Sequence, residues 1–283
     1  MNIDPNDAGG APAAGAEATE DRTDDRYIVP GLSRGLAVLQ LFSRSNSDLT
    51  LSEIADGIGL SRSAAFRLVY TLEAEGFLKR PSGTRRYQLT PRVLTLGFGY
   101  LHAQPLTAIA QPLLEKLSQL TRLSAHLVVL DGCNCVYVAR AVCDAAMVSN
   151  LQIGARFPAH VTASGRVLLA DLDDLHLRRV FSALARECRV VPPPKSIAVL
   201  TATARDDRVR LYVYGHAVFD PMVVSLAYPV RDASGNVVAA INVVGVEQLI
   251  EAQGGALALS RVVATAAAEM SALLGFGGPR IAN

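Results

Sequence analysis

The sequence has no tryptophan and only four cysteines among its 283 residues. Cys133, Cys135, Cys143 and Cys188 show neither the pairing of a disulfide framework nor the two separated pairs that are typical of a zinc site. We therefore expect reduced, mostly buried thiols, no bound metal and no other cofactor.

Long apolar runs are also missing. The longest uninterrupted stretches, such as Val237–Ile241, fall far short of the roughly 18–20 residues that span a bilayer. No apolar segment near the N-terminus resembles a signal peptide. These observations predict a cytoplasmic protein without a membrane partner.

Charge is scarce at 19% and half of the chain is hydrophobic, which excludes a disordered or fibrous protein and suits about two globular domains. The net charge of +1 conceals an uneven distribution. Residues 1–26 carry seven acidic and two basic side chains among Gly, Ala and Pro, which predicts a disordered acidic tail over residues 1–27. Residues 31–92 carry nine basic and five acidic side chains and so form a basic region.

Three short helices are predicted in the basic region. The first runs from Ser33, as its cap, to Phe42, with Leu36 and Leu39 on its apolar side. A capping box at Thr50–Glu53 opens the second helix, which extends through Asp56. Ser61 caps the third helix, which runs to Glu75 and stops at Gly76. This order is typical of a helix-turn-helix, although many helix pairs share it.

The two faces of the third helix differ in chemistry. One face carries two guanidinium groups, a hydroxyl and two aromatic rings, from Arg62, Ser63, Phe66, Arg67 and Tyr70. The opposite face carries only the apolar side chains of Ala65, Leu68, Val69 and Leu72. Such a division is expected when one face packs and the other enters a DNA groove, and the alternative is an ordinary solvated amphipathic helix.

The segment after the third helix favours the DNA interpretation. Phe77–Arg80, a turn at Pro81–Thr84, and Arg85–Leu89 predict a β-hairpin with four bases beside its tip. A basic hairpin in this position is a wing. Its cations would lie along phosphates and supply affinity that is independent of sequence and sensitive to salt.

The rest of the chain predicts an α+β domain with antiparallel strands. The expected elements are helices at Arg92–Leu101 and Pro105–Thr121, strands at His126–Leu130 and Cys133–Arg140 around an Asp131-Gly132 turn, a strand around Val148–Ile153, a break at Gly154–Pro158, a short helix at Arg166–Asp171, strands at Leu211–Phe219, Val223–Val230 and Val237–Val244, and a helix at about Leu257–Leu274. Fused to a DNA-binding module, such a domain suggests a sensor.

Catalytic and redox interpretations are possible but have weak support in the sequence. His160 with Ser164 could pair a base with a nucleophile, yet there is no Gly-x-Ser-x-Gly elbow and no obvious third member. Cys133 and Cys135 could form a redox pair, although neighbouring small apolar residues explain them as well. His126 and His216 lie in apolar strands and have no partner at metal-ligand spacing.

Several segments together resemble the isocitrate lyase regulator (IclR) family of bacterial transcription factors, from about Val29 to Gly277. The segments that carry the resemblance are Ser33–Leu39, Leu49–Leu78, Leu89–Leu94, Gly154–His160, Ser164–Ala170 and Pro229–Gly235. Within the family, the segments Gly97–Leu101, Pro105–Pro112 and Ala240–Val243 are most similar to the branch that regulates breakdown of aromatic acids such as protocatechuate and 4-hydroxybenzoate.

The resemblance implies an N-terminal winged helix-turn-helix (residues 28–90), a linker helix (91–104), a C-terminal α+β (GAF-like) effector-binding domain (105–277) and a short tail (278–283). It also implies double-stranded DNA with paired half-sites as partner, a small aromatic or carboxylic acid as effector, and assembly into homodimers or homotetramers. The linker helix would transmit effector binding to the DNA-binding modules.

Two sets of site residues follow. The candidate DNA-binding residues are Arg34, Ser61, Arg62, Ser63, Arg67, Lys79, Arg80, Thr84, Arg85 and Arg86. Family pocket positions fall at Ala163, Ser164, Asp220, Ser225, Asn242 and Val244, and Gly165 could offer a free backbone N–H to an anion at the start of a helix. The segment 219–225 is shorter than is usual in the family and lacks its acidic run.

We therefore predict a ligand-responsive transcriptional regulator and not an enzyme. The competing hypothesis is a small-molecule enzyme or binding protein whose basic N-terminal domain mediates protein contacts.

Overall fold

The computed structural model describes residues 27–42, 48–103, 105–143, 151–187, 191–217 and 220–277. The chain divides into two compact units, Met1–Leu96 and Gly97–Asn283, and each is described by itself. The predicted tails lie outside the described residues, apart from Tyr27.

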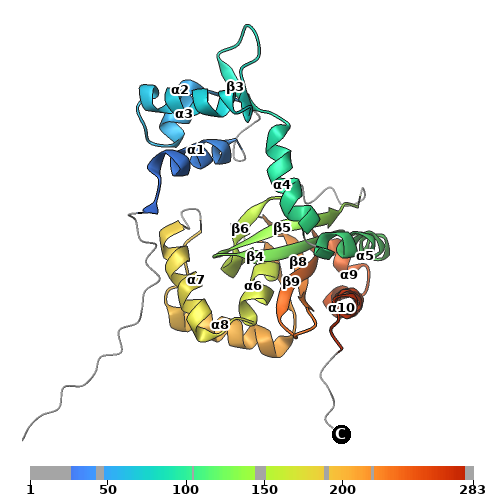
Figure 1. Ribbon diagram of the computed structural model, residues 1–283. Helices are drawn as coiled ribbons and strands as arrows, with labels where there is room; N and C mark the ends of the chain where they lie inside the picture. Colours follow the sequence, from blue (N-terminus) through green and yellow to red (C-terminus); the bar gives the residue numbers. More distant parts are fainter. Residues whose placement is uncertain are drawn as a thin grey trace, which may run out of the picture. The chain divides into compact units, whose positions relative to one another are not determined.

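In the described part of the N-terminal unit, three helices that precede α4 pack with a small sheet (Figure 1). The helices are α1 (Pro30–Leu41), α2 (Leu51–Gly57) and α3 (Arg62–Ala74). The antiparallel sheet has the order β1-β3-β2, from Asp48–Thr50, Arg86–Leu89 and Leu78–Lys79. The strands β2 and β3 form the predicted wing, so the expected winged helix-turn-helix is confirmed.

The local signals for helix ends mostly hold. Thr50 and Glu53 form the predicted capping box, the Ser61 hydroxyl accepts from the Ala64 N–H, and Gly76 has a φ of 73°. The start predicted for the first helix is wrong, because α1 begins at Pro30 and Ser33 lies inside it. Proline is favoured in the first turn, where its missing N–H costs no hydrogen bond.

The core of this unit joins all three helices to the wing. Its buried members are Val38, Phe42, Ile54, Val69, Leu78 and Tyr87. Leu36, which was expected on the apolar side of the first helix, is 51% exposed, and Val38 takes the central place. A step of three residues drifts around a helix of 3.6 residues per turn, which explains the error.

The C-terminal unit is built on one antiparallel sheet with the order β6-β5-β4-β9-β8-β7. The strands are β4 (Ser124–Asp131), β5 (Asn134–Ala141), β6 (Arg156–Pro158), β7 (Val213–Ala217), β8 (Asp220–Arg231) and β9 (Val237–Val246). The predicted α+β class with an antiparallel sheet is confirmed.

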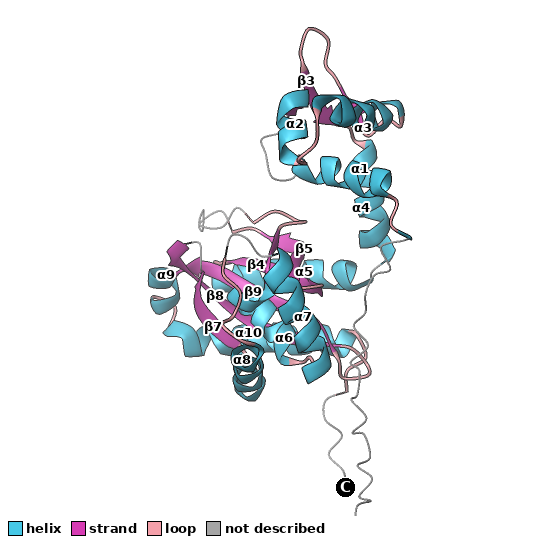
Figure 2. Ribbon diagram, turned by 90° about the vertical axis from the view of Figure 1, so that its left-hand side faces the viewer, coloured by secondary structure: helices cyan, strands magenta, loops and turns pink. Residues whose placement is uncertain are grey.

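Helices cover both faces of this sheet (Figures 1 and 2). On one face, α5 (Pro105–Thr121) and α10 (Gly255–Leu273) bury the largest core cluster, which includes Leu114, Leu127 and Ile241. On the other face lies α6 (Ala163–Ala170), through Val167 and Leu168. Beyond α6 pack α7 (Asp174–Glu187) and α8 (Ile197–Arg210). The remaining helices are α4 (Arg92–Ala103), the 3-10 turn η2 (Ala159–Val161) and α9 (Glu247–Glu251).

The structure corrects several predicted elements. Leu151–Ile153 are not in a strand, and the rest of the strand expected around Val148 lies outside the described residues. The expected break contains the short strand β6, and α6 begins three residues earlier than predicted. Both α7 and α8 were missed. The last helix is long and apolar enough by composition to cross a membrane, but one of its faces packs into the core through Val263, Ala267 and Met270.

Candidate nucleic-acid interface and ligand site

The surface of α3 has the two faces that the sequence predicted. Arg62, Ser63 and Arg67 are exposed, whereas Ala65 and Val69 are buried. The Ser61 and Ser63 hydroxyl oxygens lie 3.2 Å apart at the start of the helix. Arg34 is exposed on α1. The polar side of α3 is therefore free of contacts with the described core of its own unit.

The wing presents most of its predicted cations to solvent. Lys79, Arg80 and Arg85 are exposed on either side of the turn. Thr84 closes that turn, since its N–H and its hydroxyl both donate to the Pro81 carbonyl, at 3.1 and 3.0 Å. Closing the turn through Thr84 fixes the loop that carries the cations.

Arg86 lies at the base of the wing and is already engaged. Its Nε donates to Asp48 Oδ1 at 2.8 Å, and its Nη2 donates to Glu53 Oε2 at 3.3 Å. The sequence grouped Arg86 with the cations beside phosphates, but its guanidinium joins β3 to β1 and to α2. With two carboxylates around one guanidinium, this corner carries a net negative charge, which disfavours a phosphate.

Glu53 connects this ion pair to the helix-turn-helix. Its Oε2 accepts from the Thr50 N–H at 2.7 Å, and hydrogen bonds from Thr50, with Arg86 close by, lower the pKa of Glu53. The carboxylate that caps α2 is thus also the one that holds the wing strand. The capping box was visible in the sequence, but its link to Arg86 was not.

In the C-terminal unit, three of the predicted pocket residues share one face of the sheet. Ser225 pairs with Val244, and Asn242 lies two residues before Val244 on the same strand. Asn242 Nδ2 donates to Ser225 Oγ at 3.1 Å, and Asn242 is only 1% exposed. A buried amide paired in this way is a strongly oriented polar group.

Two further residues of this face were missed as site residues. His126 lies opposite Asn242 on β4, with its Nδ1 3.2 Å from Asn242 Oδ1, and its ring meets Tyr137 edge to face at 5.3 Å. Because an amide oxygen can only accept, Nδ1 carries the proton. Burial lowers the pKa of His126 to about 4 and raises that of Tyr137, so both groups are neutral at pH 7.

The start of α6 covers this face. Ser164 is completely buried, and its hydroxyl has no hydrogen-bond partner among the described residues, as is also true of Ser124 on β4. The amide predicted to be free at Gly165 is not, because it donates to the Thr162 hydroxyl at 2.9 Å. Ala163 packs at the edge of the same apolar cluster.

Asp220 lies apart from these buried groups. It is the exposed first residue of β8, and its Oδ1 accepts from the Met222 N–H at 3.0 Å. The structure therefore brings Ser164, Ser225 and Asn242 to one buried face of the domain and leaves Asp220 at the exposed end of a strand.

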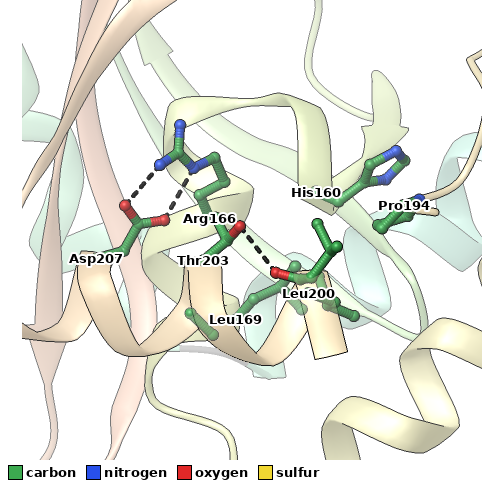
Figure 3. A pocket seen from close by; sticks show the side chains of 9 residues that line it. His160, Arg166, Leu169, Pro194, Leu200, Thr203 and Asp207 are labelled. Atoms are coloured by element: carbon green, nitrogen blue, oxygen red, sulfur yellow. Dashed lines mark hydrogen bonds and ion pairs between the residues drawn. The ribbon is translucent and has the colours of Figure 1, made fainter. Parts of the chain in front are cut away.

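A cavity of about 210 Å³ lies on the opposite side of α6, against α8 (Figure 3). Its lining includes His160, Arg166, Leu169, Leu200, Thr203 and Asp207. Arg166 binds Asp207 through two hydrogen bonds, of 2.8 and 2.6 Å, and the Asp207 side chain is 2% exposed. Here a guanidinium neutralises a buried carboxylate between two helices, so the ion pair has a structural role.

No catalytic pair forms between His160 and Ser164. His160 Nε2 lies 3.1 Å from the Pro192 carbonyl oxygen, and the Ser164 hydroxyl is buried without a partner. Within the described ranges, no group of three or more His, Cys, Asp or Glu residues is arranged to hold a metal ion. Cys133 Sγ donates to Glu187 Oε2 at 3.5 Å, and Cys135 Sγ lies 3.2 Å from Thr162 Oγ1.

Comparison with known proteins identifies both units. Residues 31–82 match the IclR helix-turn-helix domain, and residues 98–272 match the bacterial transcriptional regulator IclR C-terminal domain. The Pca regulon regulatory protein of Pseudomonas putida is 35% identical over 235 residues, which cover 82% of this chain and 79% of the relative. The p-hydroxybenzoate hydroxylase transcriptional activator of Acinetobacter baylyi is 39% identical over 159 residues, covering 54% of this chain and 57% of the relative.

Solved structures agree with this assignment. A transcriptional regulator from Rhodococcus superposes with a TM-score of 0.68 at 33% identity, over 87% of this chain and 98% of that one. An IclR homologue from Microbacterium hydrocarbonoxydans in complex with 4-hydroxybenzoate shares the fold, with a TM-score of 0.70 at 23% identity over 86% of this chain and 98% of that one. The chain belongs to the IclR family of DNA-binding transcriptional regulators, and it is not an enzyme.

Proposed function

We propose that this protein is a cytoplasmic regulator of genes for aromatic-acid breakdown, that it binds paired half-sites on double-stranded DNA as a homo-oligomer, and that a small aromatic acid is its effector. The observation that carries the proposal is the combination of an exposed cationic helix and wing with a buried polar face in the second unit. The relatives named above regulate Pca and p-hydroxybenzoate genes, which supports the choice of pathway.

The DNA-binding part of the proposal assigns different roles to helix and wing. Arg62, Ser63 and Arg67 on α3 would contact base edges and nearby phosphates in the major groove, with Arg34 and Ser61 beside them. Lys79, Arg80 and Arg85, with Thr84 at the tip, would follow the DNA backbone. Arg86 would hold the wing in place and would not bind a phosphate itself.

The effector would bind on the sheet face beneath α6. Asn242 and the Ser164 and Ser225 hydroxyls supply hydrogen bonds for a carboxylate or phenol, and the edges of Tyr137 and Phe157 supply aromatic contact. The unpartnered hydroxyls of Ser124 and Ser164 are buried donors that a ligand would satisfy. The Microbacterium homologue, which binds 4-hydroxybenzoate, supports a ligand of this class.

Self-association is proposed to use α1 and the residues before it. Leu32 and Leu36 are 64% and 51% exposed at a spacing of one helical turn, and Tyr27 and Val29 extend the apolar strip. Light scattering of the double variant Leu32→Ser, Leu36→Ser should show a smaller assembly than the wild type. If the variant and the wild type had the same molecular mass in solution, the subunits would associate through another surface.

A mobility-shift titration tests the proposal as a whole. The probe is the duplex upstream of the gene for this protein, with and without 4-hydroxybenzoate or protocatechuate. We expect complex formation by the wild type, a shifted midpoint with one of the two acids, and loss of binding in the double variant Arg62→Ala, Arg67→Ala. Turnover of the acid, or ligand binding without any DNA complex, would support the competing hypothesis instead.

Calorimetry locates the effector site. Asn242→Leu should weaken binding of the active acid at least tenfold, because it removes the central amide from the buried face. Val199→Trp, which fills the cavity between α6 and α8, should leave the affinity unchanged. The reverse result would move the effector to that cavity.

A further inference from the structure

Helix α3 exposes two large aromatic side chains in the middle of its cationic face. Phe66 is 48% exposed and Tyr70 is 63% exposed, and neither belongs to the core cluster of the unit. Their ring centroids lie 6.1 Å apart at a tilt of 38°, one helical turn from each other. Exposure of this much aromatic surface costs free energy, so a ligand that covers it would be favoured.

The neighbours of Phe66 indicate which ligand that is. Phe66 lies one turn after Arg62 on α3 and shares the polar face with Ser63 and Arg67, and all of these side chains are exposed. A protein partner would have to cover these guanidinium groups together with the ring. A DNA major groove offers phosphates for the guanidiniums, and it offers only one prominent apolar group, the C5-methyl of thymine.

We propose that Phe66 determines part of the sequence specificity by contacting thymine methyl groups, while Tyr70 packs against the Phe66 ring and holds it toward the groove. This inference rests on the proposed DNA binding, and it adds that thymine is one of the bases that the protein recognises. Phe66 lies within the first turn and a half of α3, the part of a recognition helix that reaches base edges, and Tyr70 lies one turn further along.

The test begins with DNA duplexes that the full-length protein selects from a random-sequence pool. Each thymine of the selected duplex is then replaced by deoxyuridine, which removes only the methyl group and keeps every base-pair hydrogen bond. For the wild type we expect at least one position at which this replacement weakens binding about fourfold, the effect of losing one buried methyl-sized group. Replacements at flanking positions should have no effect.

Variants assign the effect to the side chain. Phe66→Ala should bind the selected duplex about tenfold more weakly, and its affinity should no longer depend on the thymine methyl, because the two changes remove the same contact. Phe66→Leu should keep part of the methyl dependence. Leu175→Ala removes a similarly exposed apolar side chain from α7 and should change neither quantity.

The outcomes are separable. Failure to select any sequence would overturn both the proposed function and this inference. Two outcomes with the wild type would overturn the inference alone. One is selection of a site without thymine, and the other is an affinity that no uridine replacement changes. The inference would also be wrong if the affinity of Phe66→Ala still depended on the thymine methyl. It would be wrong as well if Phe66→Ala had a different oligomeric state from the wild type but the same affinity for DNA.

Discussion

The two units of this protein place their binding groups in opposite ways. In the N-terminal unit, the cations of α3 and all those of the wing except Arg86 are exposed, and they come from the single stretch of residues 62–85. In the C-terminal unit, His126 and Asn242 are 116 positions apart in the chain and are each 1% exposed. Each exposed charge contributes to binding largely independently of the others, whereas the contribution of a buried polar group depends on all of its hydrogen-bond partners.

This difference predicts that single substitutions damage the C-terminal unit more than the N-terminal unit. Four experiments test it, in order of decreasing effect.

Gly165→Ala should have the largest effect. A Cβ at this position would clash with the backbone of Ala159, which cannot move away as a side chain could. We expect the free energy of unfolding of the C-terminal unit to fall by about 3 kcal/mol or more, measured by urea denaturation. Gly215→Ala has open space around its Cβ and is the control. Equal stability of the two variants would refute the close packing of η2 on α6.

Acidification from pH 7 to pH 5 should destabilise the C-terminal unit more than the N-terminal unit. The pKa of His126 is about 4 in the folded state and about 6.5 in the unfolded state, so the unfolded chain binds more protons below pH 6.5. Stability from this group is complete above pH 6.5 and declines until about pH 4. Between pH 7 and pH 5 the expected loss is about 2 kcal/mol.

All five histidines lie after Leu96, so the histidine contribution is confined to the second unit. Burial also lowers the pKa of His160, which acts in the same direction. His126→Gln should flatten the pH dependence of unfolding by urea, and His216→Gln, at an exposed position, should not. A pH profile that is the same in His126→Gln and in the wild type would contradict a neutral buried His126.

Arg85→Ala and Arg86→Ala compare an exposed and an engaged cation within the wing. Removing one phosphate contact lowers the slope of log K against log salt by about one unit, and we expect this for Arg85→Ala. Arg86→Ala should leave the slope unchanged while weakening binding, since it releases the wing from Asp48 and Glu53. A reduced slope for Arg86→Ala would return this residue to the phosphate contacts.

Thr50→Ala should have the smallest effect. It removes the hydroxyl that accepts from the Glu53 N–H at the start of α2, and it should cost about 1 kcal/mol in the N-terminal unit. Thr71→Ala removes an exposed hydroxyl that bonds only within α3 and should change stability little. Thermal unfolding of the two variants measures the difference.

Local signals account for what could be predicted. The capping box at Thr50, the cap at Ser61 and the stop at Gly76 depend on residues three or four apart, and all three are present in the structure. Helix α5 was predicted with its observed bounds from its apolar spacing. The helices α7 and α8 were missed although local signals mark both. Asp173 accepts from the His176 N–H at the start of α7, whose Leu177, Val180 and Leu184 are buried at helical spacing, and the Ser196 hydroxyl accepts from the Val199 N–H at the start of α8.

The sequence by itself determined the winged helix-turn-helix, the two faces of α3 and the family, because these depend on nearby residues and on motifs in a fixed order. Only the tertiary structure decided which cations are available, since Arg86 meets carboxylates from β1 and α2. It also placed His126 beside Asn242 and Tyr137, through a strand pairing between distant segments. Contacts of this kind form only when the sheet closes and water is excluded, so no local pattern could have shown them.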